Sequence, residues 1–111
     1  MKYERGEIVW VKFPFSNSAT AKLRPALIIS NALVNRTGDY LMMQVTTRLR
    51  NDQLSLTIKE TDYSLQPLLK QSELRLHKIS VLNEDLIGGD ITKVTPDFMS
   101  VITREIMKLI N

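Results

Sequence analysis

The stretch GEIVWVKFP, residues 6–14, decides how this chain begins to fold. Its centre, residues 7–13, is rich in β-branched and aromatic side chains, with a glycine before it and a proline after it. Such residues favour extended backbone, whereas glycine and proline interrupt it. The stretch therefore predicts a strand over residues 7–13, and the polar residues 16–23 predict a loop after it.

Further short strands follow downstream. Some are predicted from compact apolar runs and others from alternation of apolar and polar residues at period two. The predicted strands cover residues 7–13, 26–30, 40–47, 54–59, 73–82 and 90–94, the fifth of them bent in the middle. Turn-forming residues 35–39 predict a turn, and residues 60–70, which include Pro67, predict a loop. Asn83 is expected to cap a short helical turn through Leu86 that Gly88 and Gly89 close.

The C-terminal segment changes period. Thr95 is a predicted N-cap, with Pro96 at the first helical position and Asp97 in the first turn. Helical spacing then follows at Phe98, Val101, Ile102, Glu105, Ile106 and Leu109, of which only Glu105 is polar. Six or seven short strands followed by one helix predict a mainly β barrel or sandwich, with the helix covering one opening.

Length and composition narrow the class of protein. The 111 residues contain no repeat or linker and predict one domain, residues 1–111. No cysteine is present, which excludes disulfides, thiolate catalysis and cysteine-based metal sites. Charged residues near the N-terminus argue against a secretory signal, and no run of about 18 apolar residues exists to span a membrane. A cytoplasmic protein is expected.

The distribution of charge is more informative than its total. Fifteen Lys and Arg against twelve Asp and Glu give a net charge of only +3. Between residues 22 and 50, however, the single acid is Asp39, whereas the bases are Lys22, Arg24, Arg36, Arg48 and Arg50. A local excess of positive charge of this kind is able to attract a polyanion.

Three segments together resemble the PemK/MazF toxins of type II toxin–antitoxin systems. The first is residues 6–15 and, after the polar loop, residues 24–30, which begin with Arg24-Pro25. The second is residues 44–48, and the third is residues 72–79 followed by residues 82–87. The resemblance implies an SH3-like β-barrel with a C-terminal helix, assembled as a homodimer. It also implies cleavage of single-stranded RNA, such as mRNA, without metal or other cofactor. A cognate antitoxin, whose disordered tail covers the RNA groove, is the implied protein partner.

When the 2′-hydroxyl of RNA attacks the adjacent phosphate, one group must take the proton of that hydroxyl. Another group must stabilise the negative charge that builds on the phosphate. The usual product of this reaction is a 2′,3′-cyclic phosphate. We expect Arg24 to stabilise the phosphate, because guanidinium offers a planar fork and stays charged. Thr46 matches the family's active-site threonine. Since neighbouring strand residues face opposite sides, only one of Thr46 and Thr47 can face the site, and Thr46 is favoured.

Arg75 and His77 are two residues apart on a predicted strand, so both can face one side. Some family members carry an Arg and an Asp here, proposed as acid and base. Arg75 matches, and it is assigned to phosphate binding, because arginine is a poor proton donor. His77 replaces the Asp. An imidazole can perform the same proton transfer, but an ordinary structural hydrogen bond is an equal alternative.

Other residues are candidates for contact with RNA. Lys22, Arg48 and Arg50 can line the path of the RNA backbone, with Thr47 contributing loop contacts. Phe15 is the favoured surface for base stacking, whereas Trp10 is assigned preferentially to the core.

Two other functions remain open at this stage. The same barrel occurs in CcdB-like toxins, which poison DNA gyrase by binding through C-terminal residues and cleave nothing. The predicted C-terminus is instead an amphipathic helix, and the Arg24-Pro25 junction with Thr46 favours cleavage. A catalytically inactive relative that binds RNA or antitoxin is the other alternative, and His77 in place of Asp keeps it open.

Overall fold

The computed structural model describes residues 2–13 and 22–111. Its strands are β1 (Glu7–Lys12), β2 (Leu23–Ile28), β3 (Asp39–Thr46), β4 (Ser55–Ile58), β5 (Ser72–Asn83) and β6 (Ile87–Lys93). Its helices are α1 (Ala32–Asn35) and α2 (Pro96–Ile110), with two single 3₁₀ turns, η1 (Glu60–Asp62) and η2 (Glu84–Leu86).

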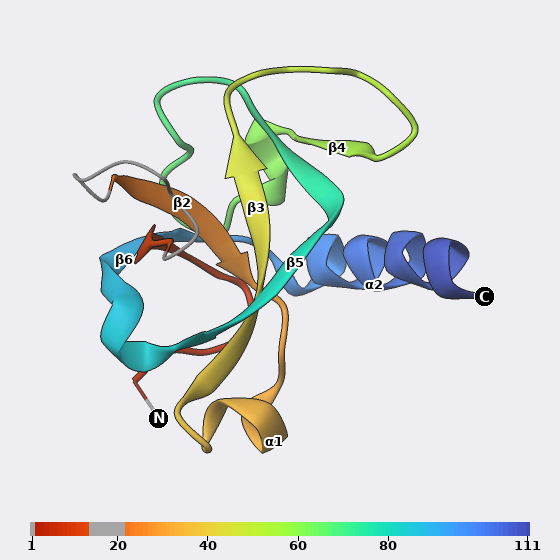
Figure 1. Ribbon diagram of the computed structural model, residues 1–111. Coiled ribbons are helices and arrows are strands. Elements are labelled where there is room, and N and C mark those ends of the chain that lie inside the picture. Colours follow the sequence, from red (N-terminus) through yellow and green to blue (C-terminus); the bar gives the residue numbers. More distant parts are fainter. Residues whose placement is uncertain (1, 14–21) are drawn as a thin grey trace.

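The described strands form one antiparallel sheet in the order β4-β5-β3-β2-β1-β6 (Figure 1). The predicted mainly β fold with a C-terminal helix is confirmed, with six strands. The sheet is strongly curved, but within the described residues β4 and β6 remain its edges, so the barrel is not closed.

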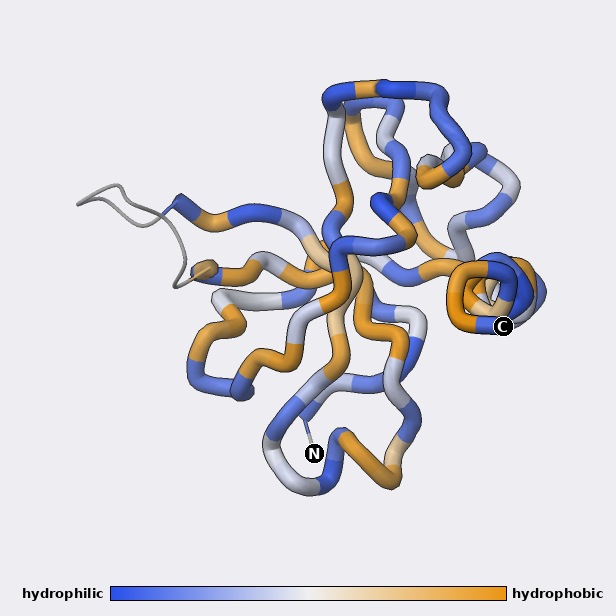
Figure 2. Tube along the Cα trace, turned by 45° about the vertical axis from the view of Figure 1, so that its right-hand side comes forward, coloured by the Kyte–Doolittle hydropathy of each residue, from blue (hydrophilic) through white to orange (hydrophobic). Residues whose placement is uncertain are grey.

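Curvature lets both faces of the sheet bury side chains, because each strand contributes alternate residues to opposite sides. We call one side the Leu27 face and the other the Ala26 face. The Leu27 face buries Ile8, Leu27, Met43, Val45, Leu74 and Leu76 with Phe98, Met99 and Ile102 of α2. The Ala26 face buries Val9, Val11, Ala26, Ile28, Tyr40, Met42 and Leu82. Figure 2 shows how apolar residues recur along the strands.

Strand β5 bends sharply, as predicted. Met43 of β3 pairs with Ile79, but two residues later Val45 pairs with Leu74. Gln44 therefore stands opposite four residues of β5, residues 75–78. An irregularity of this kind bends the strand and redirects its side chains, which opens the sheet locally beside Gln44.

One local prediction is confirmed and one was wrong. The turn predicted over residues 35–39 is present as a turn at residues 36–38, directly after α1, a short helix that the sequence did not predict and that Asn31 caps by accepting from Leu33 N–H at 3.0 Å. Gly88 and Gly89 do not close the 3₁₀ turn; they lie within β6. A Cβ at Gly88 would lie 3.2 Å from Leu23 Cδ2, so the side chain of Leu23 would have to shift slightly to admit a larger residue.

Helix α2 begins as predicted, with Thr95 Oγ1 accepting from Phe98 N–H at 3.1 Å and Pro96 at the first position. Phe98, Met99 and Ile102 are buried against the sheet, and Ile106 packs half-buried against the same core. The C-terminal end of the helix projects away from the sheet (Figure 1), and Met107 and Ile110 are exposed. The helix therefore covers the Leu27 face as far as Ile106. Neither described helix is long and apolar enough to cross a membrane.

Candidate functional site

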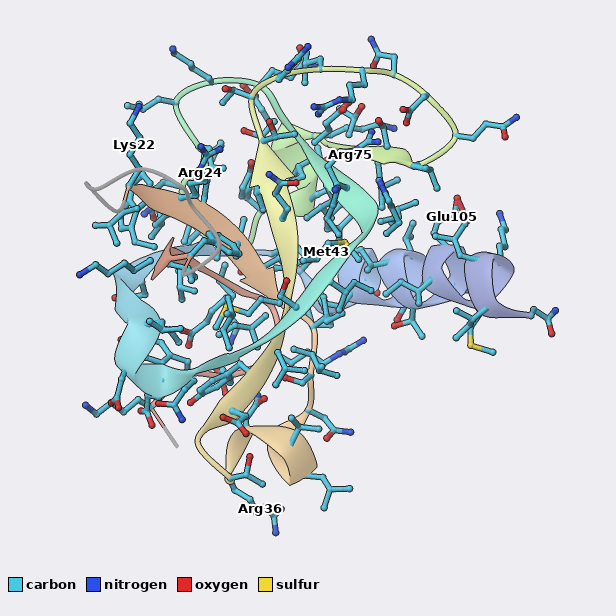
Figure 3. All side chains as sticks on the ribbon, in the orientation of Figure 1. Lys22, Arg24, Arg36, Met43, Arg75 and Glu105 are labelled. Atoms are coloured by element: carbon cyan, nitrogen blue, oxygen red, sulfur yellow. The ribbon has the colours of Figure 1, made fainter. Side chains whose placement is uncertain are left out.

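Arg24 and Thr46 occupy the same end of the sheet and the same face. Ala26 of β2 pairs with Gln44 of β3, and Arg24 and Thr46 lie two residues farther along these antiparallel strands. Continuing the register places Arg24 opposite Thr46, and period-two alternation puts both on the Ala26 face with Gln44. Arg24 is exposed (Figure 3), so its guanidinium is available to a ligand.

Thr46, and not Thr47, shares the face of Arg24. Its neighbour Val45 is buried on the Leu27 face, whereas Met42 and Gln44 point the other way. Thr46 Oγ1 accepts a hydrogen bond from Arg48 N–H at 3.1 Å, which leaves its hydroxyl hydrogen to donate. Thr47 lies beyond the strand end and lines a different, apolar pocket.

Glu73 extends this row of residues, and sequence reasoning missed it. It pairs with Thr46 across β3 and β5 and is fully buried. Its Oε1 accepts from Arg50 N–H at 2.8 Å and from the Ser55 hydroxyl at 2.9 Å. Its Oε2 has no hydrogen-bond partner in the described part of the chain. In the sequence, Glu73 is only an acidic residue in a predicted strand, and no local pattern indicates that it is buried.

The carboxyl of Glu73 is held ionised. Burial alone would raise its pKa, but hydrogen bonds from Arg50 N–H, Ser55 and Asn51 N–H, together with the charge of Arg75, bring the pKa below the ordinary value. Two of these donors belong to the loop between β3 and β4. Glu73 therefore fastens that loop onto β5.

Arg75 is buried, a position that does not favour its predicted role in phosphate binding. Its side chain is only 7% exposed, and its Nη1 donates to Asp52 Oδ1 at 2.9 Å and to Ser55 Oγ at 2.7 Å. Glu73 Oε1 lies 3.8 Å away. Figure 3 shows Arg75 on the β5 side of the sheet, apart from Arg24. Its guanidinium is committed to the protein interior and holds Asp52 of the loop.

His77 lies where β5 bends, and its side chain is exposed. It lines a cavity of about 340 Å³ whose other walls include Phe13, Gln44 and Ser80. Gln44, which lines this cavity, is two residues before Thr46 on the same face of β3. Of Arg75 and His77, only His77 is open to solvent.

The remaining predicted contacts surround this face. Lys22 is exposed immediately before β2 and close to Arg24 (Figure 3), and Arg48 and Arg50 are exposed on the loop between β3 and β4. Phe15 lies outside the described residues. Within residues 2–13 and 22–111, no three acidic or histidine side chains gather as metal ligands would.

Acid should weaken the fold through Asp52. Hydrogen bonds from Arg75 and Ser55 lower its pKa from 3.8 to about 2. A carboxylate whose pKa falls on folding stabilises the native state above its unfolded pKa, and this contribution is lost as the pH falls toward the folded value. We therefore expect the free energy of unfolding to drop more steeply between pH 4 and pH 2 in the wild type than in Asp52→Asn, measured by urea denaturation at each pH. Parallel pH profiles would contradict this.

Comparison with known proteins shows which protein family this chain matches. Residues 4–110 match the model of the PemK-like, MazF-like toxins of type II toxin–antitoxin systems. A search of curated protein sequences returned no significant match.

Solved structures agree on the fold. An endoribonuclease from a mycobacterial species is 22% identical, with a TM-score of 0.78 over 99% of this chain and 92% of that one. A mycobacterial endoribonuclease in complex with its cognate antitoxin is 24% identical, with a TM-score of 0.77 over 97% and 94%. MazF from Deinococcus radiodurans is 18% identical, with a TM-score of 0.76 over 97% and 96%.

Proposed function

The chain belongs to the PemK-like, MazF-like toxins of type II toxin–antitoxin systems, and from this premise we propose that it is an endoribonuclease that cleaves single-stranded RNA. The observation that carries the proposal is the placement of Arg24 and Thr46 on one exposed face at one end of the sheet. The endoribonucleases of the same fold support it. We further propose a homodimer that acts on mRNA in the cytoplasm and is neutralised by a cognate antitoxin, as in the mycobacterial complex.

The proposed reaction is a transfer within the RNA. His77 takes the proton of a ribose 2′-hydroxyl, whose oxygen attacks the adjacent phosphorus as the bond to the 5′-oxygen breaks. Arg24 neutralises the charge that builds on the phosphoryl oxygens, and the Thr46 hydroxyl donates to one of them. Water protonates the leaving 5′-oxygen. The products are a 2′,3′-cyclic phosphate and a 5′-hydroxyl, and no step uses a metal ion.

The test is incubation of the purified protein with a long single-stranded RNA in EDTA. Discrete fragments are expected, with 5′ ends that polynucleotide kinase labels without prior phosphatase treatment. Mass spectrometry of the 3′ ends should show a cyclic phosphate that mild acid opens. RNA left intact by a protein that still arrests growth would contradict cleavage and favour a toxin that acts by binding alone. Linear 3′-phosphates or 3′-hydroxyls formed from the outset would contradict the proposed chemistry.

His77 should make cleavage sensitive to acid. A protonated imidazole cannot accept the 2′-hydroxyl proton, so the rate is expected to fall on acidification. His77→Ala should cleave about 100-fold more slowly and lose this pH dependence, as measured by single-turnover cleavage between pH 5 and pH 8.

Lys78→Ala is the matched control, since Lys78 is the next residue and lines the same cavity. It should keep the pH profile of the wild type. An unchanged profile in His77→Ala would remove His77 from proton transfer and leave the roles of Arg24 and Thr46 standing.

A further inference from the structure

The loop between β3 and β4, residues 47–54, presents two arginines to solvent (Figure 1). Arg48 and Arg50 are both exposed, and within residues 2–13 and 22–111 neither side chain forms an ion pair or a hydrogen bond. Their guanidinium groups are therefore available to the phosphates of a polyanion. Binding is tighter when such side chains are held in place beforehand, because less ordering is required.

Hydrogen bonds fix the backbone of this loop at successive residues. Arg48 N–H donates to Thr46 Oγ1 at 3.1 Å, and Arg50 N–H donates to Glu73 Oε1 at 2.8 Å. The backbone of Asn51, with a φ of 49°, is left-handed, and its N–H also donates to the Glu73 carboxylate. Left-handed backbone is uncommon outside glycine, so the contact with Glu73 helps to hold this conformation.

Glu73 is at the centre of the attachment. It is fully buried, and its Oε1 receives the Arg50 and Ser55 hydrogen bonds, whereas its Oε2 has no partner in the described part of the chain. A buried ionised group destabilises a fold unless it is well paired, and an apolar side chain of similar volume is often more stable in its place. A buried carboxylate with one unpaired oxygen therefore indicates a role other than stability.

We propose that Glu73 is a positioning residue for the RNA substrate: it fixes the loop so that Arg48 and Arg50 bind phosphates of the strand. The inference rests on the proposed function. Glu73 is buried and acts through the backbone of Arg50 and Asn51, without touching RNA. Its charge matters, because hydrogen bonds to an ionised oxygen are about twice as strong as those between neutral groups. Because Glu73 pairs with Thr46, the loop is held beside the end of β3.

The sign of the effect separates positioning from ordinary electrostatics. Glu73→Gln removes a negative charge, and a lower negative charge by itself strengthens the attraction of a polyanion. Positioning predicts the opposite, weaker binding, because the loop is held less firmly. Glutamine keeps the volume and one acceptor oxygen, so the variant is expected to fold; circular dichroism checks this.

The binding test uses a fluorescein-labelled, mixed-sequence 2′-O-methyl RNA, which cannot be cleaved. Its anisotropy is measured against protein concentration at a series of NaCl concentrations. In Glu73→Gln the Kd is expected to rise about tenfold at low salt. The slope of log Kd against log salt should fall by about 1.4, since each phosphate contact of a single strand contributes about 0.7. An unchanged or lower Kd with the slope of the wild type would overturn the inference.

Glu84→Gln is the matched control. Its Oε1 is also buried and has no hydrogen-bond partner in the described structure. Glu84 follows Asn83, however, which pairs with Asp39 at the opposite end of β3 from Thr46. The substitution removes the same charge far from the loop, so RNA should bind as tightly as to the wild type or slightly more tightly.

A double-mutant cycle tests whether Glu73 acts through the two arginines. When Arg48→Ala and Arg50→Ala are already present, adding Glu73→Gln should change the Kd no further, because the groups that it positions are gone. A further tenfold rise in that background would overturn the proposed route.

A second variant keeps the test decisive if Glu73→Gln does not fold. Asp52→Asn weakens the next attachment of the same loop, the hydrogen bond from Arg75. It also removes a negative charge, yet it should bind RNA more weakly and with a shallower salt slope. Tighter binding with the slope of the wild type would overturn the inference.

Cleavage kinetics separate the inference from the proposed function. Glu73→Gln should raise KM about tenfold and leave kcat near the wild-type value, because Arg24 and Thr46 lie on β2 and β3. Arg24-dependent cleavage with an unchanged KM in Glu73→Gln would overturn positioning and leave the endoribonuclease standing. Weaker, less salt-dependent binding by Glu73→Gln, in a protein that cleaves no RNA, would support positioning and overturn cleavage. Absence of any RNA binding by the wild type would overturn both.

Discussion

Arg24→Ala is expected to lower kcat/KM for RNA cleavage about 1000-fold, the upper range for loss of one group that stabilises transition-state charge. Arg24 is exposed, and within residues 2–13 and 22–111 it forms no ion pair. Its removal therefore breaks no described salt bridge of the fold. The loss should be measured on a short fluorogenic RNA, with circular dichroism to check that the variant melts near the wild-type temperature.

Two matched variants sharpen this prediction. Arg24→Lys keeps the charge but not the planar fork, so it should recover only part of the rate. Arg36→Ala is the control, since Arg36 is an exposed arginine that caps α1 at the far end of the molecule (Figure 3) and should retain full activity. Cleavage by Arg24→Ala within tenfold of the wild type would remove Arg24 from the centre of the site.

Arg75→Met is expected to cost the fold about 3 kcal/mol, because it leaves the buried carboxylate of Glu73 without its nearest positive charge. For a chain of this length the melting temperature should fall by roughly 10 °C. The substitution also frees Asp52, so the loop between β3 and β4 loses one of its attachments to β5. Urea denaturation followed by circular dichroism measures the loss.

A double substitution tests the cause. Arg75→Met combined with Glu73→Gln should be more stable than Arg75→Met alone, because no unpaired charge remains buried. Arg104→Met, at an exposed position on α2, should change the free energy of unfolding by less than about 0.5 kcal/mol. A stable Arg75→Met protein with impaired cleavage would restore Arg75 as a direct phosphate ligand.

The sequence predicted only part of the candidate site. Arg24 and Thr46 were predicted from the resemblance to the PemK/MazF toxins, and strand alternation added only that one of Thr46 and Thr47 faces the site. Glu73 and Trp10 were not assigned correctly, since Glu73 is fully buried and the side chain of Trp10 is 40% exposed. Both sit in strands, where burial depends on which neighbours cover them, and no local pattern contains that information.

Arg75 shows the same limit for charged residues. Spacing two apart predicts that Arg75 and His77 face one side of the strand, but both lie in the bent stretch of β5, where Arg75 is buried and His77 is exposed. The sequence does not reveal that the loop carrying Asp52 folds over one and leaves the other in solvent. In a sequence, an arginine that is free to bind phosphate cannot be distinguished from one that is neutralised by carboxylates. The difference depends on the position of the loop that carries Asp52.

What the sequence determined by itself is most of the elements: the strands, six where six or seven were expected, the bend in β5, the 3₁₀ turn after Asn83 and the helix capped by Thr95, but not α1 or η1. These follow from periodicity and capping, which act over a few neighbouring residues. Tertiary structure alone decided the order of strands and the register of β2 against β3, which brings Arg24 and Thr46 to the same end of the sheet. It also decided the burial of Glu73 and the exposure of Trp10. Those features depend on contacts between residues that are far apart in the chain. Such contacts form, and contribute free energy, only once the strands have assembled into the sheet.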